Sequence, residues 1–198
     1  MRESLTLLAL VAALGGCAED RIEPTPTADG GEAAATPAAL AWVAAQHVGQ
    51  PHSARSERDF AEELGNGAVG TELRFRSGSQ DDGDLLVVAV GNKNPDGLRC
   101  TPDHETGGGG CVTTDRGTLI WEDAAPEEDP GNVGVAITKG DVTVLVFQSG
   151  PAITRDPREL DLRISVEEMF GIAADPRTDL ITSERAVVEG EDLPYWDG

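Results

Sequence analysis

Residues 132–150 read NVGVAITKGDVTVLVFQSG, two runs rich in β-branched residues with a Gly between them. Val, Ile and Thr favour extended backbone, and Gly140 suits a tight turn, so the stretch predicts a β-hairpin that turns at Lys139-Gly140. The second run, Val142–Phe147, is apolar on both of its faces. A strand of that kind belongs in the middle of a sheet that is covered above and below.

Other strands are expected upstream of this hairpin. The segment Asp84–Val90, DLLVVAV, is also apolar on both faces and should be central. Thr71–Arg76 alternates between apolar and charged residues, which is typical of a half-exposed strand. Residues 111–122, CVTTDRGTLIWE, predict a second hairpin with its turn at residues 115–117. Short connections between successive strands favour antiparallel pairing.

Helices should flank these strands. Thr36 precedes PAALAWVAAQHV, residues 37–48, and a capping hydroxyl followed by Pro marks a helix start. A short helix is expected at Glu57–Leu64. Ser165 and Glu168 form a capping-box pattern at the start of SVEEMFGIAAD. The fold class is therefore expected to be α+β: a single domain with an antiparallel meander sheet of about five to six strands and flanking helices.

The first 17 residues read MRESLTLLALVAALGGC. The apolar run Leu5–Leu14 is too short to span a bilayer as a helix, which needs roughly 20 residues. Leu14, Gly15, Gly16 and Cys17 resemble the lipobox of bacterial lipoprotein precursors. The resemblance implies a signal peptide at residues 1–16, cleavage before Cys17, and a diacylglycerol on the Cys17 thiol, often with an amide-linked fatty acid such as palmitate. An alternative is a plain secretory signal with an incidental cysteine.

A tether is expected to follow at residues 17–36. This segment lacks aromatic residues, and Pro24, Pro26 and the Gly30–Gly31 pair discourage both helix and strand. The folded extracytoplasmic domain is expected at residues 37–198. The protein would then be anchored by lipid on the extracytoplasmic face of the cell membrane, where two or more acyl chains hold a protein stably.

The charge of the chain excludes one class of partner. The formal net charge is −21, so long-range repulsion opposes an encounter with nucleic acid or an anionic membrane surface. We expect no nucleic-acid binding and no cofactor. The expected contact with the membrane is the lipid on Cys17.

Two cysteines remain once Cys17 carries the lipid, namely Cys100 and Cys111. An oxidising compartment pairs such cysteines, which predicts a structural disulfide. The alternative is a zinc site that also uses His104. Its spacing, C-x₃-H-x₆-C, lacks the close cysteine pair of most structural zinc sites.

A calcium site is a weaker alternative for the same stretch. Asn92, Asn94, Asp96 and Asp103 fall at ligand positions of an EF-hand-like loop. However, position 1 is a neutral Asn and position 12 is an Asp in place of a bidentate Glu. Residues 94–97, NPDG, are also typical of a β-turn, which is the interpretation that the sequence favours.

No catalytic residues are identified from the sequence. The segment FQSGP around Ser149 lacks the first Gly of a nucleophile elbow. Two segments are candidates for partner binding. One is the arginine-rich stretch 154–163, and the other is the C-terminal LPYWDG. Their candidate residues are Arg155, Arg158, Arg163, Tyr195 and Trp196.

These observations favour a membrane-anchored lipoprotein whose domain is a non-enzymatic binding or interaction module. Its partner would be an envelope protein or a small ligand. Two alternatives stay open at this point. One is a small exported hydrolase, and the other is a regulator or assembly factor for an envelope complex.

Overall fold

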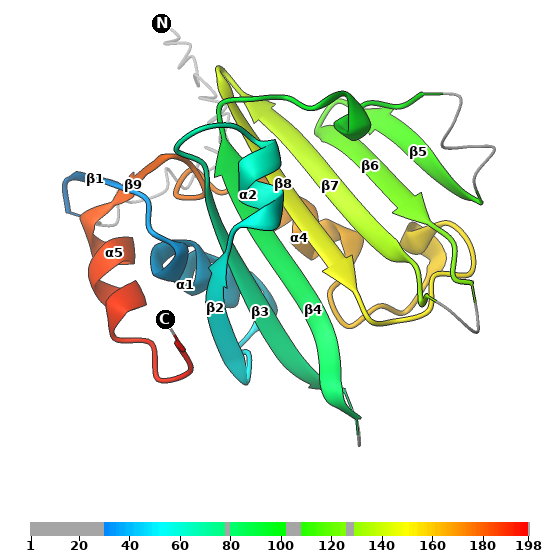
Figure 1. Cartoon of the computed structure of the whole chain (residues 1–198), viewed down its shortest axis with the longest axis horizontal. Helices are drawn as coiled ribbons and strands as arrows, with labels where there is room; N and C mark the ends of the chain where they lie inside the picture. The colour runs from blue at the N-terminus through cyan, green and yellow to red at the C-terminus, as the bar shows by residue number, and fades with distance from the viewer. Residues whose placement is uncertain (1–29, 78–79, 102–107, 126–128, 198) are drawn as a thin grey trace, which may run out of the picture.

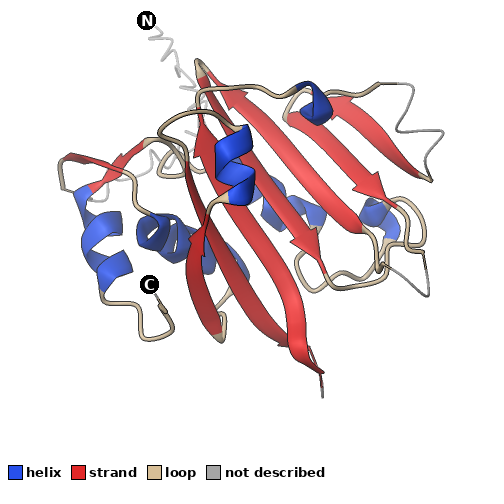
Figure 2. Cartoon of the chain, in the orientation of Figure 1, coloured by secondary structure: helices blue, strands red, loops and turns tan. Residues whose placement is uncertain are grey.

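The computed structural model describes residues 30–77, 80–101, 108–125 and 129–197. Helices and antiparallel strands form one α+β domain, as the sequence predicted (Figure 2). The segment expected to be a signal peptide, Cys17 and most of the expected tether lie outside the described residues. Within the described part, no helix has the length and apolar character needed to cross a bilayer.

The main sheet has seven antiparallel strands in the order β2-β3-β4-β8-β7-β6-β5. Two meanders, β2 to β4 and β5 to β8, meet where β4 pairs with β8. The sheet therefore has more strands than the five to six expected. Its strands are β2 (Ser53–Glu57), β3 (Val69–Ser77), β4 (Gln80–Gly91), β5 (Gly109–Thr114), β6 (Gly117–Glu122), β7 (Asn132–Lys139) and β8 (Val142–Ser149).

The two strands that are apolar on both faces lie at the centre of this sheet, as predicted. Val88 of β4 pairs with Val146 of β8, and both are fully buried. The β7–β8 hairpin turns at Gly140-Asp141, one residue later than expected. Gly140 has a φ of 59°, a conformation that side-chain-bearing residues avoid.

Two helices cover one face of the sheet, which we call the closed face. They are α1 (Pro37–Val48) and α4 (Val166–Ala174), and both lie behind the sheet in Figure 1. The Thr36 side chain accepts a hydrogen bond from the Ala39 amide, and Ser165 with Glu168 completes the predicted capping box. Beneath these helices lies one continuous core that includes Leu86, Met169 and Phe170.

The opposite face, which we call the open face, carries only short elements. They are α2 (Asp59–Glu63) and the 3-10 turn η1 (Asp96–Leu98), both in front of the sheet in Figure 1. A further 3-10 turn, η2 (Pro157–Glu159), lies in the segment between β8 and α4. The open face is therefore covered only in part.

Two local expectations were wrong, and one helix was missed. Residues 53–57 form strand β2, so the helix predicted at Glu57–Leu64 starts two residues later. Strand β1 (Glu32–Ala34) pairs with β9 (Ile181–Ser183), so the tether ends before residue 32 and the folded part begins upstream of Pro37. Helix α5 (Glu184–Glu191), which the sequence did not predict, packs against α1. Long-range pairing explains the differences at β1 and β2, because each pairs with a strand that is distant in sequence.

Candidate functional site

A groove lies on the open face between the sheet, α2 and η1. Its volume is about 320 Å³. We call it the sheet-face groove. Strands β6, β7 and β8 form its floor, and the short elements form its walls. The residues that line it are Phe60, Glu63, Pro95, Gly97, Leu98, Ile120, Glu122, Asn132, Gly134, Leu145 and Phe147.

The floor follows from the two-residue period of the strands. Along β8, Val144 and Val146 belong to the core of the closed face, whereas Leu145 packs with residues of α2 on the open face. Gly134 of β7 has no side chain, and an added Cβ there would meet no atom nearer than 3.9 Å. The floor is therefore apolar and hollow at its centre.

The walls are held by local contacts. The Phe60 ring of α2 lies 4.8 Å from the Phe147 ring, measured between centroids. The Glu57 carboxylate accepts hydrogen bonds from the amides of Asp59 and Phe60, which satisfies the first turn of α2. On the other side, the Leu98 amide donates to the Pro95 carbonyl within η1.

A disulfide links the η1 segment to the sheet. Cys100 and Cys111 are bonded, with a Cα–Cα distance of 5.3 Å, so the predicted pair is confirmed. Cys111 lies opposite Ile120, a floor residue, on the neighbouring strand. Cys100 is two residues beyond Leu98, so the bond joins a wall of the groove to the edge of its floor. The zinc alternative is wrong, because a disulfide leaves neither thiolate free for a metal.

The polar side chains of the groove are few. The Asn132 side-chain amide donates to the Glu122 carboxylate at 2.7 Å. Glu63 on α2 and Glu122 on β6 are both exposed carboxylates. The lining residues include neither Lys nor Arg. The groove thus combines apolar walls with negative charge at its rim.

The calcium candidates do not converge in the described structure. The Asn94 side chain donates to Thr138, and Asp96 lies 3.9 Å from the Arg99 guanidinium. Asp103 and His104 lie outside the described residues. Among the described residues, no group of three or more His, Cys, Asp or Glu side chains is placed to hold a metal.

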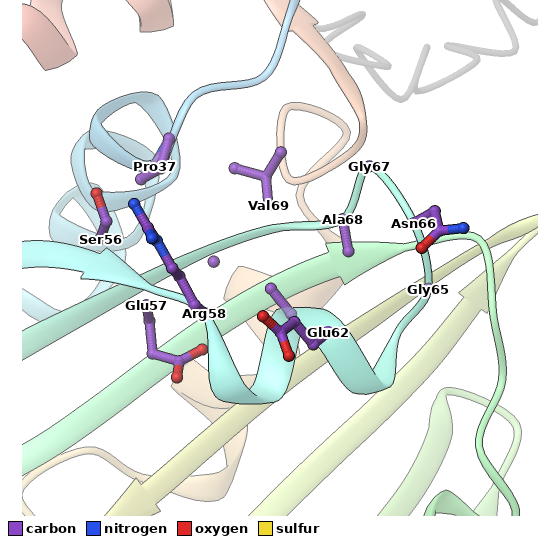
Figure 3. Close-up of a pocket in the computed structure, with 12 residues that line it drawn as sticks. Pro37, Ser56, Glu57, Arg58, Glu62, Gly65, Asn66, Gly67, Ala68 and Val69 are labelled. Carbon is purple, nitrogen blue, oxygen red and sulfur yellow. The ribbon is translucent and has the colours of Figure 1, made fainter.

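A larger and more polar cleft of about 700 Å³ lies between α1, the end of β2 and α2. In Figure 3 the Arg58 side chain extends toward Ser56 and Pro37, and the Glu62 carboxylate lies beside α2. The opposite wall is mostly the glycine-rich segment 65–70. We call it the α1–α2 cleft. It has no aromatic lining residue, and its charges are of both signs.

A buried ionic cluster joins the ends of α1 and α4. The Asp175 carboxylate lies 2.9 Å from His47 Nε2 and 2.7 Å from an Arg177 guanidinium nitrogen. Burial alone would raise the pKa of Asp175, but hydrogen bonds from Arg177 and His47 outweigh it and lower the pKa to about 2. Lys139 donates to the carbonyls of Asp175 and Thr178, and burial lowers its pKa. The His47–Asp175 contact links the C-terminal end of α1 to the C-terminal end of α4, so the cluster has a structural role.

The two aromatic partner-binding candidates, Tyr195 and Trp196, pack against the domain itself. The backbone amide of Ala54 in β2 donates to the carbonyl of Tyr195, and the Asp197 amide donates to the carbonyl of Ala54. Tyr195 and Trp196 are half-buried against the core. The tail therefore lies back on the domain, and its two aromatic side chains pack within the chain.

The three arginine candidates are exposed but already interact locally. Arg155 donates to the carbonyl of Glu159, and Arg158 forms an ion pair with the Asp156 carboxylate. Arg163 lies over the Phe75 ring, 4.9 Å from its centroid. The structure does not bring these arginines together with Tyr195 and Trp196 by any contact among the described residues.

The sequence did not identify the groove. Its residues come from six elements or loops, so no local motif marks it. One signal was present: Gly134 interrupts an otherwise apolar strand, and a strand glycine often marks a close approach or an empty position. No family model, no curated protein and no solved structure matches this chain.

Proposed function

We propose that this protein is a lipid-anchored extracytoplasmic binding module and that the sheet-face groove is its ligand site. The observation that carries the proposal is the hollow, apolar floor at Gly134, Leu145 and Phe147, with a few polar groups at the rim. Small-molecule sites have this composition: mostly apolar lining with a small number of polar groups that fix orientation.

The groove is favoured over the larger α1–α2 cleft. A ligand gains binding free energy from apolar and aromatic side chains that it can desolvate, and the groove supplies Phe60 and Phe147. The cleft offers Arg58 and Glu62, both exposed, and a wall of glycines. Because the charges of the cleft are of both signs, they partly cancel and favour neither a cationic nor an anionic ligand.

The disulfide supports a binding role at this place. The turn η1 has no buried residue of its own. A bond between Cys100 and Cys111 fixes this wall without a large local core, and a fixed wall lowers the entropy cost of binding. It also suits an oxidising compartment, in agreement with export through the lipobox at Leu14–Cys17.

The anchor is tested by metabolic labelling with a fatty-acid probe. We expect the wild-type protein to incorporate the probe in a bacterial host and the Cys17→Ser variant to lose it. The matched control is a Cys100→Ser/Cys111→Ser variant, which removes the other two cysteines and should still be labelled. Labelling of Cys17→Ser equal to that of wild type would rule out the anchor.

The site is tested by a fragment screen followed by NMR on the purified protein. Amide shifts should concentrate around the groove residues. Gly134→Val should abolish them, because the added methyl groups occupy the hollow floor. Thr118→Val, on the same face but outside the lining, is the control and should bind as wild type does. Shifts that gather elsewhere, or that survive in Gly134→Val, would exclude this site.

A further inference from the structure

The negative charge of the sheet-face groove restricts which ligands it can bind. Its ionisable lining side chains are Glu63 and Glu122, and both are carboxylates. Neither forms an ion pair with Lys or Arg among the salt bridges of the described structure. Asn132 donates one hydrogen bond to Glu122 and leaves the charge in place. An incoming cation therefore meets negative charge without displacing a protein cation first.

The aromatic residues add attraction of the same sign. The Phe60 and Phe147 rings are tilted by 38° at a centroid distance of 4.8 Å, and both line the groove. The face of an aromatic ring is negative and attracts ammonium groups, most strongly where water is excluded. Leu98, Ile120 and Leu145 beside them provide apolar contact for a hydrocarbon chain.

The rest of the molecule acts in the same direction. With a formal net charge of −21, the chain attracts cations and repels anions over distances beyond direct contact. The volume of about 320 Å³ is near the lower end of the range for small-molecule sites, about 300–1,000 Å³. The groove is thus sized for a small molecule.

We propose that the sheet-face groove binds a small organic cation with an apolar body, such as an alkylammonium or arylalkylammonium compound. This inference rests on the proposed function of the same groove. The ammonium group pairs with the Glu63 and Glu122 carboxylates beside the two Phe rings, and the apolar body packs against Leu98, Ile120 and Leu145.

The experiment compares three probes with the same six-carbon body and different charge. They are n-hexyltrimethylammonium, 1-hexanol and hexanoate, titrated by NMR against the purified protein. We expect the cation to bind more tightly than the alcohol, and hexanoate to bind most weakly. Glu63→Gln and Glu122→Gln should each lower the affinity for the cation by about two- to fivefold, the range for exposed charge pairs. The affinity for the alcohol should not change.

A charge control separates the groove from the overall field. Asp161→Asn removes one exposed negative charge from a residue outside the groove lining. It should leave the affinity for the cation unchanged. If Asp161→Asn weakens the cation as much as Glu122→Gln does, the preference comes from net charge and the proposal is overturned.

The remaining outcomes distinguish this inference from the function on which it rests. If the three probes bind the groove equally, the groove is a binding site without a preference for cations, and only this inference fails. If none of them shifts the groove resonances and the fragment screen is also negative there, the proposed function fails as well. If Gly134→Val no longer binds the cation and Thr118→Val binds it as wild type does, the interaction lies in the groove.

Discussion

The two faces of one sheet differ in how completely they are covered. On the closed face, α1 and α4 bury a continuous apolar core in which Leu86, Val146 and Met169 are inaccessible to solvent. On the open face, α2 and η1 leave a groove above Gly134. The same strands supply both surfaces because their side chains alternate. The comparison teaches that the covering elements, and not the sheet, decide which face stabilises the fold and which face remains available for a ligand.

The largest expected effect contrasts the two faces directly. Leu86→Ala should lower the free energy of unfolding by about 3–4 kcal/mol, because it opens a cavity under α1 and α4. Leu98→Ala, in the wall of the groove, should cost only about 1 kcal/mol, because Leu98 is already partly exposed. Urea denaturation of both variants measures the difference. Equal losses would mean that the open face is packed as tightly as the closed one.

The second prediction concerns the covalent link on the open face. Cys100→Ser/Cys111→Ser should lower the free energy of unfolding by about 2.5 kcal/mol, because the bond closes a loop with a sequence separation of 11 residues. Hydrogen exchange should quicken more at η1 and β5 than in α1 and α4, because the η1 and β5 amides lose a local restraint in addition to the shared loss of global stability. Non-reducing peptide mapping of the wild-type protein should recover the linked peptides. An equal increase in exchange rate at η1 and β5 and across the closed face would contradict the division between the faces.

The third prediction concerns the stability of the closed face at low pH. Asp175 has its pKa lowered from 3.8 to about 2, so its folded form holds protons less tightly than its unfolded form does. Its contribution, about 2 kcal/mol, is present above pH 3.8 and is lost as the pH falls toward 2. Asp175→Asn should remove this part of the pH dependence in denaturation curves measured between pH 2 and 5. A variant with the same acid sensitivity as wild type would exclude Asp175 as its source.

The smallest effect is an expected gain of stability. Gln148 is fully buried on the closed face, and its side-chain amide has no hydrogen-bond partner among the described residues. Gln148→Met keeps the length of the side chain and removes the buried polar atoms, so it should raise the free energy of unfolding by about 1 kcal/mol. Thermal denaturation measures the change. A loss of stability would show that Gln148 serves a polar contact and that the closed face is less uniformly apolar than its core indicates.

Part of the fold could be predicted because its signals are local. The capping box of Ser165 and Glu168, the Thr36 cap and the β7–β8 hairpin each depend on a few neighbouring residues, and the structure confirms all three. Strand β2 could not be predicted in this way, and helix α5 was missed although Ser183 caps its first turn. Strand β2 is stabilised by pairing with β3 and by the C-terminal tail, and α5 by packing on α1. These contacts join residues that are far apart in the chain.

The candidate site also has one part that could be predicted from the sequence and one part that could not. The Cys100–Cys111 bond was expected from the cysteine count and from the expectation of export, because cysteines in an oxidising compartment pair. The groove beside it was not expected. It needs Phe60 to meet Phe147, and Gly134 to lie beneath them. Individually, each of these residues is an ordinary part of a helix or strand.

Residue types and their spacing were enough to predict the capped and periodic secondary structure, the antiparallel α+β class and the pairing of the two cysteines. These depend on residue type and on neighbours along the chain. Three features depend on packing between distant segments: which face of the sheet the longer helices cover, where the C-terminal tail packs, and the groove with acidic and aromatic residues that remains on the other face. The physical reason is that burial is settled by which surfaces meet in space, and segments distant in sequence compete for the same apolar strands.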